Sequence, residues 1–208
     1  CILLFSDLKR FEVFPIDVWV RRVMNDLYIK EEDETKVSKK EIQRLADNKF
    51  GNLQFEKVSL DKILKQSVRK YSQMFILQKI RLDYRPVERI VLTDEKWLEF
   101  VTEQILSNAL KYTKNGGEIR ICLEEKRGRE CLVIEDNGIG IQAEDLPRVF
   151  EKGFTGYNGR NDKKATGLGL NLCRKAAEHL NVGIAVESKP GVGSCFTLDL
   201  KERQFNIE

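Results

Sequence analysis

The sequence lacks the features that mark several large classes of protein. No run of about 18 apolar residues is present, so no helix is expected to span a bilayer. The five cysteines form no CxxC pair and no metal-ligand spacing, and their odd number argues against a disulfide framework. A formal net charge of +3 is too small to indicate nucleic acid or an anionic membrane as the partner. No signal peptide is visible and the first residue is Cys1, so we expect a piece of a longer protein.

What is present is typical of an ordinary folded protein. The chain has 208 residues, enough for one good-sized domain with an appendage. Charged residues make up 33% of the chain and hydrophobic residues 41%, which excludes disordered and membrane-embedded classes. Cys122, Cys131 and Cys195 lie in strand-like segments, where a buried thiol behaves as a small apolar side chain. Unpaired cysteines predict a reducing environment, and therefore a cytoplasmic location.

The first quarter of the chain differs in amino-acid composition from the rest. Residues 1–28 are apolar and rich in aromatics, and Pro15 is placed to begin a helix. Residues 30–41 are charged throughout, which predicts a surface linker. We therefore expect two parts, a small helical N-terminal appendage at 1–53 and a coherent domain at 54–208.

The larger part alternates helix-like and strand-like patterns. Ser59 is a candidate N-cap for its first helix, and its long second helix should start near Thr93. The strand-like segments pair mostly as hairpins. The predicted helices are 58–80, 93–113 and 168–181, and the predicted strands are 81–86, 89–94, 118–125, 130–136, 182–188 and 195–200. This pattern predicts an α+β fold, a two-layer sandwich of helices on a mixed, mainly antiparallel sheet.

The long second helix carries two amides, Gln104 and Asn108, one turn apart among apolar residues. A side-chain amide oxygen is a hard neutral ligand that suits Mg²⁺, whose remaining positions go to water and phosphates. Lys111 lies on a neighbouring face and could reach a phosphate. Alternatively, Asn108 only hydrogen-bonds a neighbouring loop, as most buried amides do. The helix alone leaves both interpretations open.

Two glycine-containing motifs follow that helix. In EDNGIGI, Asp136 ends an apolar strand, and a carboxylate there would select a donor such as the exocyclic amine of adenine. Gly138 and Gly140 would let the backbone approach the ring, although DNG is also a common turn signal. In KKATGLGL, Gly167 and Gly169 open a helix whose free backbone N–H groups could bind phosphate. The spacing matches neither the P-loop nor the dinucleotide fingerprint.

Residues 150–164 lie between these motifs, and a loop this long inside a compact domain is disordered or functional, often an active-site lid. A fourth motif, GVGS at 191–194, could be only a hairpin turn. The order and spacing of the four motifs are nevertheless specific. The segment from about Phe55 to Leu200 resembles the ATP-binding catalytic domain of sensor histidine kinases, in the superfamily shared with DNA gyrase, Hsp90-type chaperones and mismatch-repair ATPases.

Two stretches, DEKWLEFVTEQILSNALKYT and VFEKGFTGYNGRNDKKATGLGL, look like the kinases that sense peptide antibiotics such as bacitracin beside an ABC transporter. Full-length relatives of this intramembrane-sensing type are anchored in the plasma membrane. That subfamily usually has an aromatic residue where this chain has Asn171, and the change bears on helix packing more than on nucleotide binding.

The resemblance implies a Bergerat-type ATP-binding fold, with ATP and Mg²⁺ as cofactors. Asp136 would bind adenine, Asn108 would hold the Mg²⁺ that bridges the phosphates, and Lys111 would neutralise phosphate charge. Gln104, Asn108 and Lys111 are the implied catalytic residues. The implied nucleotide-binding residues are Asn108, Lys111, Tyr112, Asp136, Gly138, Gly140, Phe150, Phe154, Thr166, Gly167, Leu168, Gly169, Leu170 and Ser194.

The implied reaction transfers the γ-phosphoryl group of ATP to a histidine on a separate phosphoacceptor domain, and indirectly to a response regulator. The single histidine, His179, stands in the motif AAEHLNV, which lacks the acidic neighbour of a phosphoacceptor site, so this chain is not expected to phosphorylate itself. Hydrolytic relatives place a glutamate one turn before the magnesium asparagine as a general base. Gln104 cannot accept that proton, and Glu103 points about 100° away around the helix. A non-enzymatic nucleotide-binding module remains an alternative.

The N-terminal part resembles a different family. Residues 1–53, with the motif PIDVWV, are similar to the late part of bacterial 8-oxoguanine DNA glycosylases, and Asp17 matches the aspartate that assists base excision there. The nucleophilic lysine and the DNA-binding hairpin would precede Cys1, so a glycosylase remnant is expected to be inactive and to bind no nucleic acid. Alternatively, residues 11–28 form an amphipathic helix that packs on the kinase-like domain.

Overall fold

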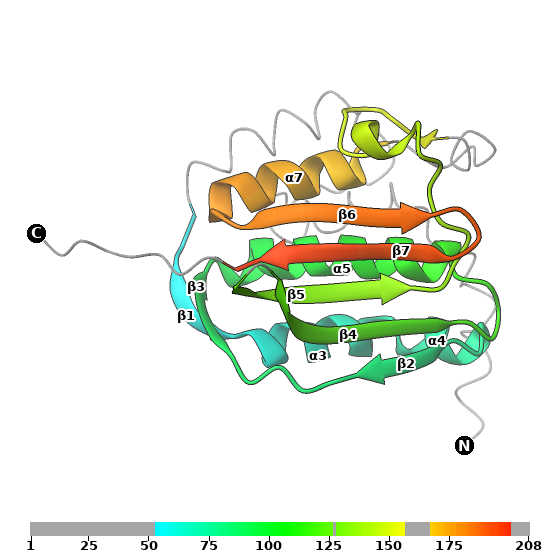
Figure 1. The fold of residues 1–208 in the computed structure, drawn as a ribbon. Helices are drawn as coiled ribbons and strands as arrows, with labels where there is room; N and C mark the ends of the chain where they lie inside the picture. The colour runs from blue at the N-terminus through cyan, green and yellow to red at the C-terminus, as the bar shows by residue number, and fades with distance from the viewer. Residues whose placement is uncertain (1–52, 127, 157–166, 201–208) are drawn as a thin grey trace, which may run out of the picture.

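A five-stranded sheet forms one layer of the fold (Figure 1). The computed structural model describes residues 53–126, 128–156 and 167–200. The strands are Arg81–Tyr84 (β2), Glu118–Lys126 (β4), Arg129–Asp136 (β5), Gly183–Lys189 (β6) and Gly193–Asp199 (β7). Their order is β2-β4-β5-β7-β6; β2 runs parallel to β4 and the other three pairs are antiparallel. The predicted mixed, mainly antiparallel sheet is confirmed.

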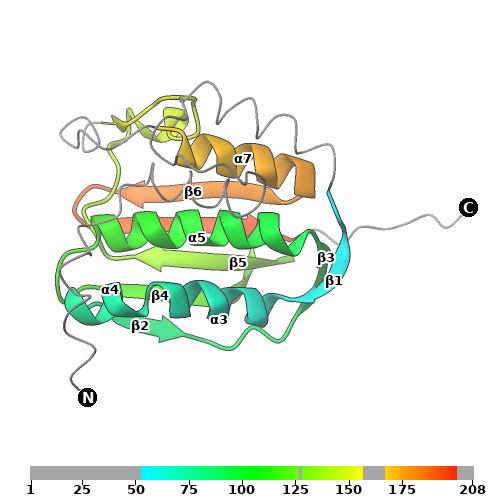
Figure 2. The same cartoon turned by 180° about the vertical axis from the view of Figure 1, so that it is seen from behind.

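Helices form the second layer and cover one face of the sheet, as Figure 2 shows. They are Leu60–Lys70 (α3), Ser72–Leu77 (α4), Glu95–Tyr112 (α5) and Gly169–Leu180 (α7). The short 3-10 helix η3 spans Leu146–Arg148, and strands Glu56–Ser59 (β1) and Ile90–Thr93 (β3) pair in a separate two-stranded sheet. The predicted two-layer α+β sandwich is therefore confirmed.

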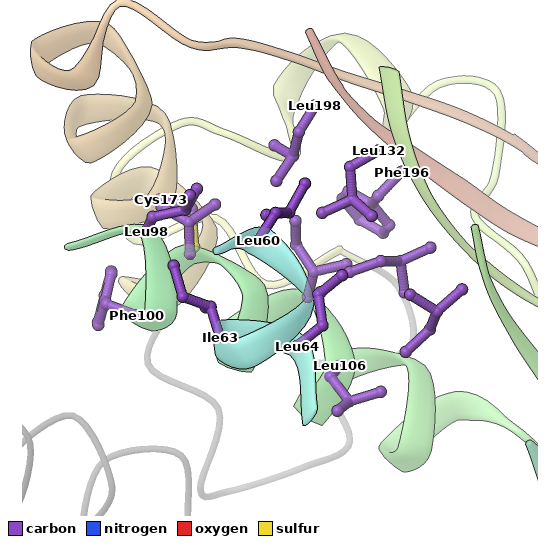
Figure 3. Packing of buried hydrophobic residues seen from close by; sticks show 14 of the residues in the cluster. Leu60, Ile63, Leu64, Leu98, Phe100, Leu106, Leu132, Cys173, Phe196 and Leu198 are labelled. Atoms are coloured by element: carbon purple, nitrogen blue, oxygen red, sulfur yellow. The ribbon is translucent and has the colours of Figure 1, made fainter. Parts of the chain in front are cut away.

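The core lies between the two layers. Alternate residues of β4 and β5 face the helices, and Ile121 of β4 pairs with Ile134 of β5 in that buried row. Figure 3 shows the same core from within, where the α3 and α5 side chains meet those of the strands. The residues labelled there are Leu60, Ile63, Leu64, Leu98, Phe100, Leu106, Leu132, Cys173, Phe196 and Leu198. Full burial of each leucine or isoleucine contributes about 1.5–3 kcal/mol, so this cluster holds the helices on the sheet.

The helix predicted within 58–80 begins where its Ser59 N-cap placed it, but it does not run unbroken to residue 80. Val58 belongs to β1, where it pairs with Val91 of β3, and the helix begins only after Ser59. Ser59 is confirmed as the N-cap, since its hydroxyl accepts a hydrogen bond from the Lys62 amide. The helical run then breaks at Tyr71, whose φ of −99° and ψ of 6° end α3 before α4 starts. Local periodicity could not reveal the strand, because β1 depends on a partner more than thirty residues away.

The other predicted elements agree with the structure to within a few residues. The long helix starts at Glu95, where the Asp94 carboxylate caps it by accepting a hydrogen bond from the Trp97 amide at 3.1 Å. Cys122 and Cys131 are buried thiols in strands, as expected, whereas Cys195 is half-buried. The N-terminal appendage lies outside the described residues. Within the described part, none of the helices combines the length and apolar character needed to cross a membrane.

The Asp61 carboxylate links helix α3 to the end of β2 and to the segment that follows it. This contact gives a testable prediction. The Oδ1 atom of Asp61 accepts hydrogen bonds from the Tyr84 hydroxyl (2.6 Å) and the Val87 amide (3.1 Å), and its Oδ2 pairs with Lys65. Hydrogen bonds from Lys65 and Tyr84 lower the pKa of Asp61 from 3.8 to about 2. We expect Asp61→Ala to reduce the free energy of unfolding by about 1–2 kcal/mol at pH 7, as measured by urea denaturation.

The pH dependence of that loss has a defined sign. A depressed carboxylate pKa stabilises the folded state above the ordinary value of 3.8 and ceases to do so as the pH falls through about 2. The difference between wild type and Asp61→Ala should therefore shrink between pH 4 and pH 2. Asp83→Ala is the matched control, because Asp83 makes only a long, exposed ion pair with Arg85 (3.7 Å). Equal losses in the two variants would contradict this account.

Candidate functional site

The predicted site residues gather at one end of the sandwich. The C-terminal end of α5, the end of β5, the turn between β6 and β7, and the start of α7 meet there, at the right of Figure 1. These segments carry all four sequence motifs. The fold thus brings together residues that lie up to ninety positions apart in the sequence.

Asp136 is the most deeply buried charged group at this end. It is the last residue of β5, and it is only 6% exposed. Burial raises the pKa of Asp136 from 3.8 to about 6, although backbone N–H groups of Gly138 and Ser194 oppose the shift. The Gly138 amide donates to Oδ1 at 2.9 Å. A buried acceptor of this kind favours a ligand that donates a hydrogen bond, as predicted for adenine.

The glycines after Asp136 have a structural reason that the sequence prediction missed. A Cβ at Gly138 would lie 2.4 Å from the Tyr112 carbonyl oxygen, and a Cβ at Gly140 would lie 2.0 Å from the Lys189 carbonyl oxygen. Gly140 also has a φ of +70°. The loop therefore needs glycine to pack backbone against backbone. Close approach of the Gly140 backbone to an adenine ring stays a prediction.

The turn between β6 and β7 packs against the loop that follows Asp136. Ser188, near the end of β6, makes the hydrogen bonds that link the two. Its hydroxyl accepts a hydrogen bond from the Ile141 amide (2.9 Å) and donates to the Gly193 carbonyl (2.7 Å). It also lies 3.1 Å from the hydroxyl of Ser194. Sequence analysis did not single out Ser188; its position just before the Lys189–Gly193 turn was the one available signal. Ser194 is buried and is thereby placed beside Asp136, its partner in the sheet.

The amide helix α5 presents its two amides differently. Gln104 is only 1% exposed, and its Nε2 has no hydrogen-bond partner in the described part of the chain. Asn108, one turn further on, is half-buried, and no described residue hydrogen-bonds its side chain. The interpretation that Asn108 only tethers a neighbouring loop thus finds no support within the described residues. At the end of the helix, the Lys111 ammonium lies 5.0 Å from the centre of the Tyr112 ring.

Glu103 is the nearest carboxylate to these amides in sequence, and its side chain points toward α3. It is 3% exposed and forms an ion pair with Lys70 of α3 at 2.8 Å. Burial raises the pKa of Glu103, and the hydrogen bond from Lys70 opposes that shift. The Glu103 side chain is therefore held between α3 and α5 by Lys70, and that it does not replace a base at Gln104 stays a prediction.

The start of α7 offers backbone donors. Its N-cap residue is Leu168, which makes no side-chain capping hydrogen bond, so the first turn carries N–H groups of the kind that bind anions. Gly167 has a φ of +67°, and a Cβ there would lie 2.4 Å from the Gly153 carbonyl carbon. Gly153 in turn donates to the Gly167 carbonyl at 3.0 Å. Thr166 lies outside the described residues.

The two predicted aromatic residues, Phe150 and Phe154, lie near the start of α7. Phe150 is partly buried against the core, and the Arg174 guanidinium lies 5.9 Å from the centre of its ring. Phe154 is half-buried with the Arg148 guanidinium 4.6 Å from its ring centre.

His179 is exposed in the last turn of α7, at the far end of that helix from the glycines. The structure therefore separates the single histidine from the candidate site.

The residues present fit a nucleotide better than a metal held by protein groups alone. No group of three His, Cys, Asp or Glu side chains suited to a metal occurs among the described residues. Mg²⁺ commonly takes few protein ligands and completes its shell with water and phosphates, so the amide oxygen of Asn108 would suit it only together with a bound phosphate. A buried acceptor at Asp136 and a helix start at α7 without a side-chain cap suit the two ends of a nucleoside triphosphate.

The buried carboxylate, the amide-bearing helix and the start of α7 are arranged at one end of the α+β sandwich in a way that suits a nucleotide. Residues 93–204 match the family described as histidine kinase-, DNA gyrase B-, and HSP90-like ATPase, and the chain belongs to this family. The match includes all four motifs, so the family resemblance inferred from the sequence is confirmed.

Similar proteins are sensor kinases. The chain is 40% identical over 156 residues to the sensor protein BceS of Halalkalibacterium halodurans, covering 74% of this chain and 46% of that protein. It is 30% identical over 202 residues to the sensor histidine kinase YxdK of Bacillus subtilis, covering 85% of this chain and 61% of that protein. The chain thus spans less than two thirds of these relatives. The mycobacterial sensor histidine kinase MprB has the same fold, with a TM-score of 0.62, 22% identity and coverage of 73% of this chain and 100% of that one.

Proposed function

We propose that this chain is the ATP-binding catalytic domain of a two-component sensor histidine kinase. In this role it transfers the γ-phosphoryl group of ATP to a histidine on a separate phosphoacceptor domain, and from there to a response regulator. The observation that carries the proposal is the juxtaposition of Asp136, Asn108 and the start of α7 at one end of a fold of this family. Its sensor-kinase relatives support the same activity.

Each site residue has a proposed part in this reaction. Asp136 binds the exocyclic amine of adenine, with Tyr112 and Gly140 beside the ring. Backbone N–H groups near Gly167 and Gly169 hold the outer phosphates, and Lys111 neutralises their charge. The remaining proposed nucleotide contacts are Gly138, Phe150, Phe154, Thr166, Leu168, Leu170 and Ser194. Phosphoryl transfer asks mainly for positioning and charge neutralisation, which these groups supply.

Asn108 is the proposed magnesium ligand. Mg²⁺ bound there would bridge phosphate oxygens and reduce the negative charge that the acceptor histidine must approach. Gln104 has no carboxylate with which to activate water, and its 1% exposure keeps the side chain away from solvent. Both properties favour transfer to a histidine over hydrolysis.

The location and partners follow from this role and stay proposals. A domain that consumes ATP and has free cysteines, four of them among the described residues, suits the cytoplasm. The resemblance of two sequence stretches to the kinases that sense peptide antibiotics favours a full-length kinase that works beside an ABC transporter. No nucleic acid is expected to bind.

The direct test mixes the chain with ATP, Mg²⁺ and an isolated phosphoacceptor hairpin from a bacitracin-sensor kinase. Labelled phosphate should appear on the hairpin's histidine and not on His179. Steady phosphate release without the hairpin would indicate a hydrolytic ATPase instead. Tight ATP binding without transfer would indicate a non-enzymatic nucleotide-binding module.

Asn108→Ala should reduce the rate of phosphoryl transfer to that hairpin by at least about a hundredfold. The substitution removes the one proposed protein ligand of Mg²⁺, while alanine preserves the helix. Ser107→Ala is the matched control, since it changes the neighbouring half-buried position on α5. A transfer rate within threefold of wild type, with Mg²⁺ still required, would exclude Asn108 as the ligand.

For the N-terminal part we propose a domain boundary near residue 53, with residues 1–53 as a remnant of an 8-oxoguanine DNA glycosylase. The motif around Asp17 favours this origin. The YxdK match points the other way, because coverage of 85% of the chain must reach into the first 53 residues. Excision of 8-oxoguanine from a duplex should be undetectable; cleavage that is lost in Asp17→Asn would show an active glycosylase.

A further inference from the structure

One polar contact joins the first turn of α7 to the segment that precedes residues 157–166. The Asn171 side chain donates from Nδ2 to the Phe150 carbonyl oxygen at 2.9 Å, across 21 positions of the sequence. One turn further along the same helix, Arg174 lies over the Phe150 ring. Helix α7 therefore holds Phe150 twice, once by its backbone and once by its ring.

The same two segments also touch at the backbone, so Asn171 belongs to a larger joint. Gly153 donates to the Gly167 carbonyl, and Gly167 packs so closely on Gly153 that no Cβ fits between them. The stretch from Phe150 to Phe154 and the start of α7 are thus linked at three points. Movement of one segment must be transmitted to the other.

The Asn171 amide is poorly suited to a purely stabilising role. Its Oδ1 is buried and has no hydrogen-bond partner in the described part of the chain. A buried acceptor left unsatisfied generally costs more than one neutral hydrogen bond contributes. An apolar side chain of similar size would remove that cost and would also remove the hydrogen bond to Phe150, so asparagine brings the folded state little net gain. Such local inconsistencies are typical of residues kept for function.

We propose that Asn171 is a positioning residue for the phosphates of ATP. It fixes the Phe150 backbone on the first turn of α7, the turn whose N–H groups are the proposed phosphate donors, and so sets the spacing between the two segments. This inference rests on the proposed function, because it assumes that the start of α7 binds phosphate. Asn171 touches Phe150 and acts through it.

The test compares Asn171→Leu and Asn171→Ser with wild type, using calorimetry with ATP and with adenosine. Both variants should bind ATP about tenfold more weakly, which corresponds to about 1.4 kcal/mol, and adenosine within twofold of wild type. Adenosine keeps the contact with Asp136 but has no phosphates. In the transfer assay the KM for ATP should rise by the same factor while kcat stays within twofold. The melting temperature of Asn171→Leu should be close to that of wild type, because the lost hydrogen bond and the removed unsatisfied acceptor offset each other.

Gln66→Leu is the matched control, an amide-to-leucine change at an exposed position of α3. It should alter neither ligand's affinity. Unchanged ATP affinity in both Asn171 variants would overturn the inference, and so would equal losses for ATP and adenosine or a loss that follows a fall in melting temperature. A wild-type chain that binds no ATP would overturn the proposed function and this inference together.

Discussion

Asp136→Asn is expected to weaken ATP binding by about a hundredfold. The Gly138 amide donates to Oδ1 at 2.9 Å, so an asparagine must turn its own oxygen toward Gly138. Its NH₂ group would then face the nucleotide, where the exocyclic amine of adenine also donates. Two donors that meet in a buried site leave both unsatisfied, at a cost of about 1–3 kcal/mol. Calorimetry with ATP at pH 7.5 measures this loss.

The matched control is Asp83→Asn, which makes the same chemical change at a half-exposed position on β2, outside the candidate site. Its ATP affinity should equal that of wild type. If Asp136→Asn bound ATP within threefold of wild type, Asp136 would not be the adenine acceptor. A loss shared by both variants would point to net charge as the cause.

The same substitution should reveal the cost of keeping this carboxylate buried. Burial raises the pKa of Asp136 to about 6, so the nucleotide-free folded state gains stability as the pH falls through that value. A raised pKa stabilises the folded state fully below 3.8 and no longer does so once the pH exceeds about 6. Wild type should therefore gain stability relative to Asp136→Asn between pH 7 and pH 4, as measured by thermal unfolding. ATP binding by wild type should weaken over the same interval.

The fold could be predicted from the sequence wherever the signal was local. In the hairpin β4–β5, apolar residues alternate along β4 and form a continuous run in β5, and α5 has a capping aspartate followed by a long apolar pattern. β1 and the parallel pairing of β2 with β4 were not predictable in this way. Both depend on partners distant in sequence, and a strand of four residues has too few positions to show a period.

The candidate site could be predicted as a set of residues but not as a geometry. Motif order identified Asp136, Asn108 and Gly167, because these residue types carry the chemistry. The sequence did not reveal which residues hold these groups in place. Ser188 and Asn171 make hydrogen bonds to backbone groups that are distant in sequence. The glycines show the same limit: the sequence suggested that they make room for a ligand, and it gave no sign that Gly138 also makes room for the Tyr112 carbonyl and Gly140 for the Lys189 carbonyl. A motif therefore locates chemistry more reliably than it explains each of its own residues.

Gly140→Ala should destabilise the domain by about 3 kcal/mol or more and weaken ATP binding with it. The new Cβ would lie 2.0 Å from the Lys189 carbonyl oxygen and 3.0 Å from Pro190 Cα, both backbone atoms that no rotamer change can clear. The turn must then move away, which strains the hydrogen bonds from the Gly191 amide to the Ile139 carbonyl and from Ile141 to Ser188. Urea denaturation and ATP titration measure the two effects.

Gly128→Ala separates this packing effect from backbone strain. Gly128 has a φ of +72°, nearly that of Gly140, yet a Cβ there meets nothing within 4 Å. Its alanine variant should lose only the about 1–2 kcal/mol of a left-handed conformation and should bind ATP as wild type does. The excess loss in Gly140→Ala then measures how far the turn between β6 and β7 supports the loop that follows Asp136. Equal losses in the two variants would mean that the turn yields freely, and that Asp136 is held by its own strand alone.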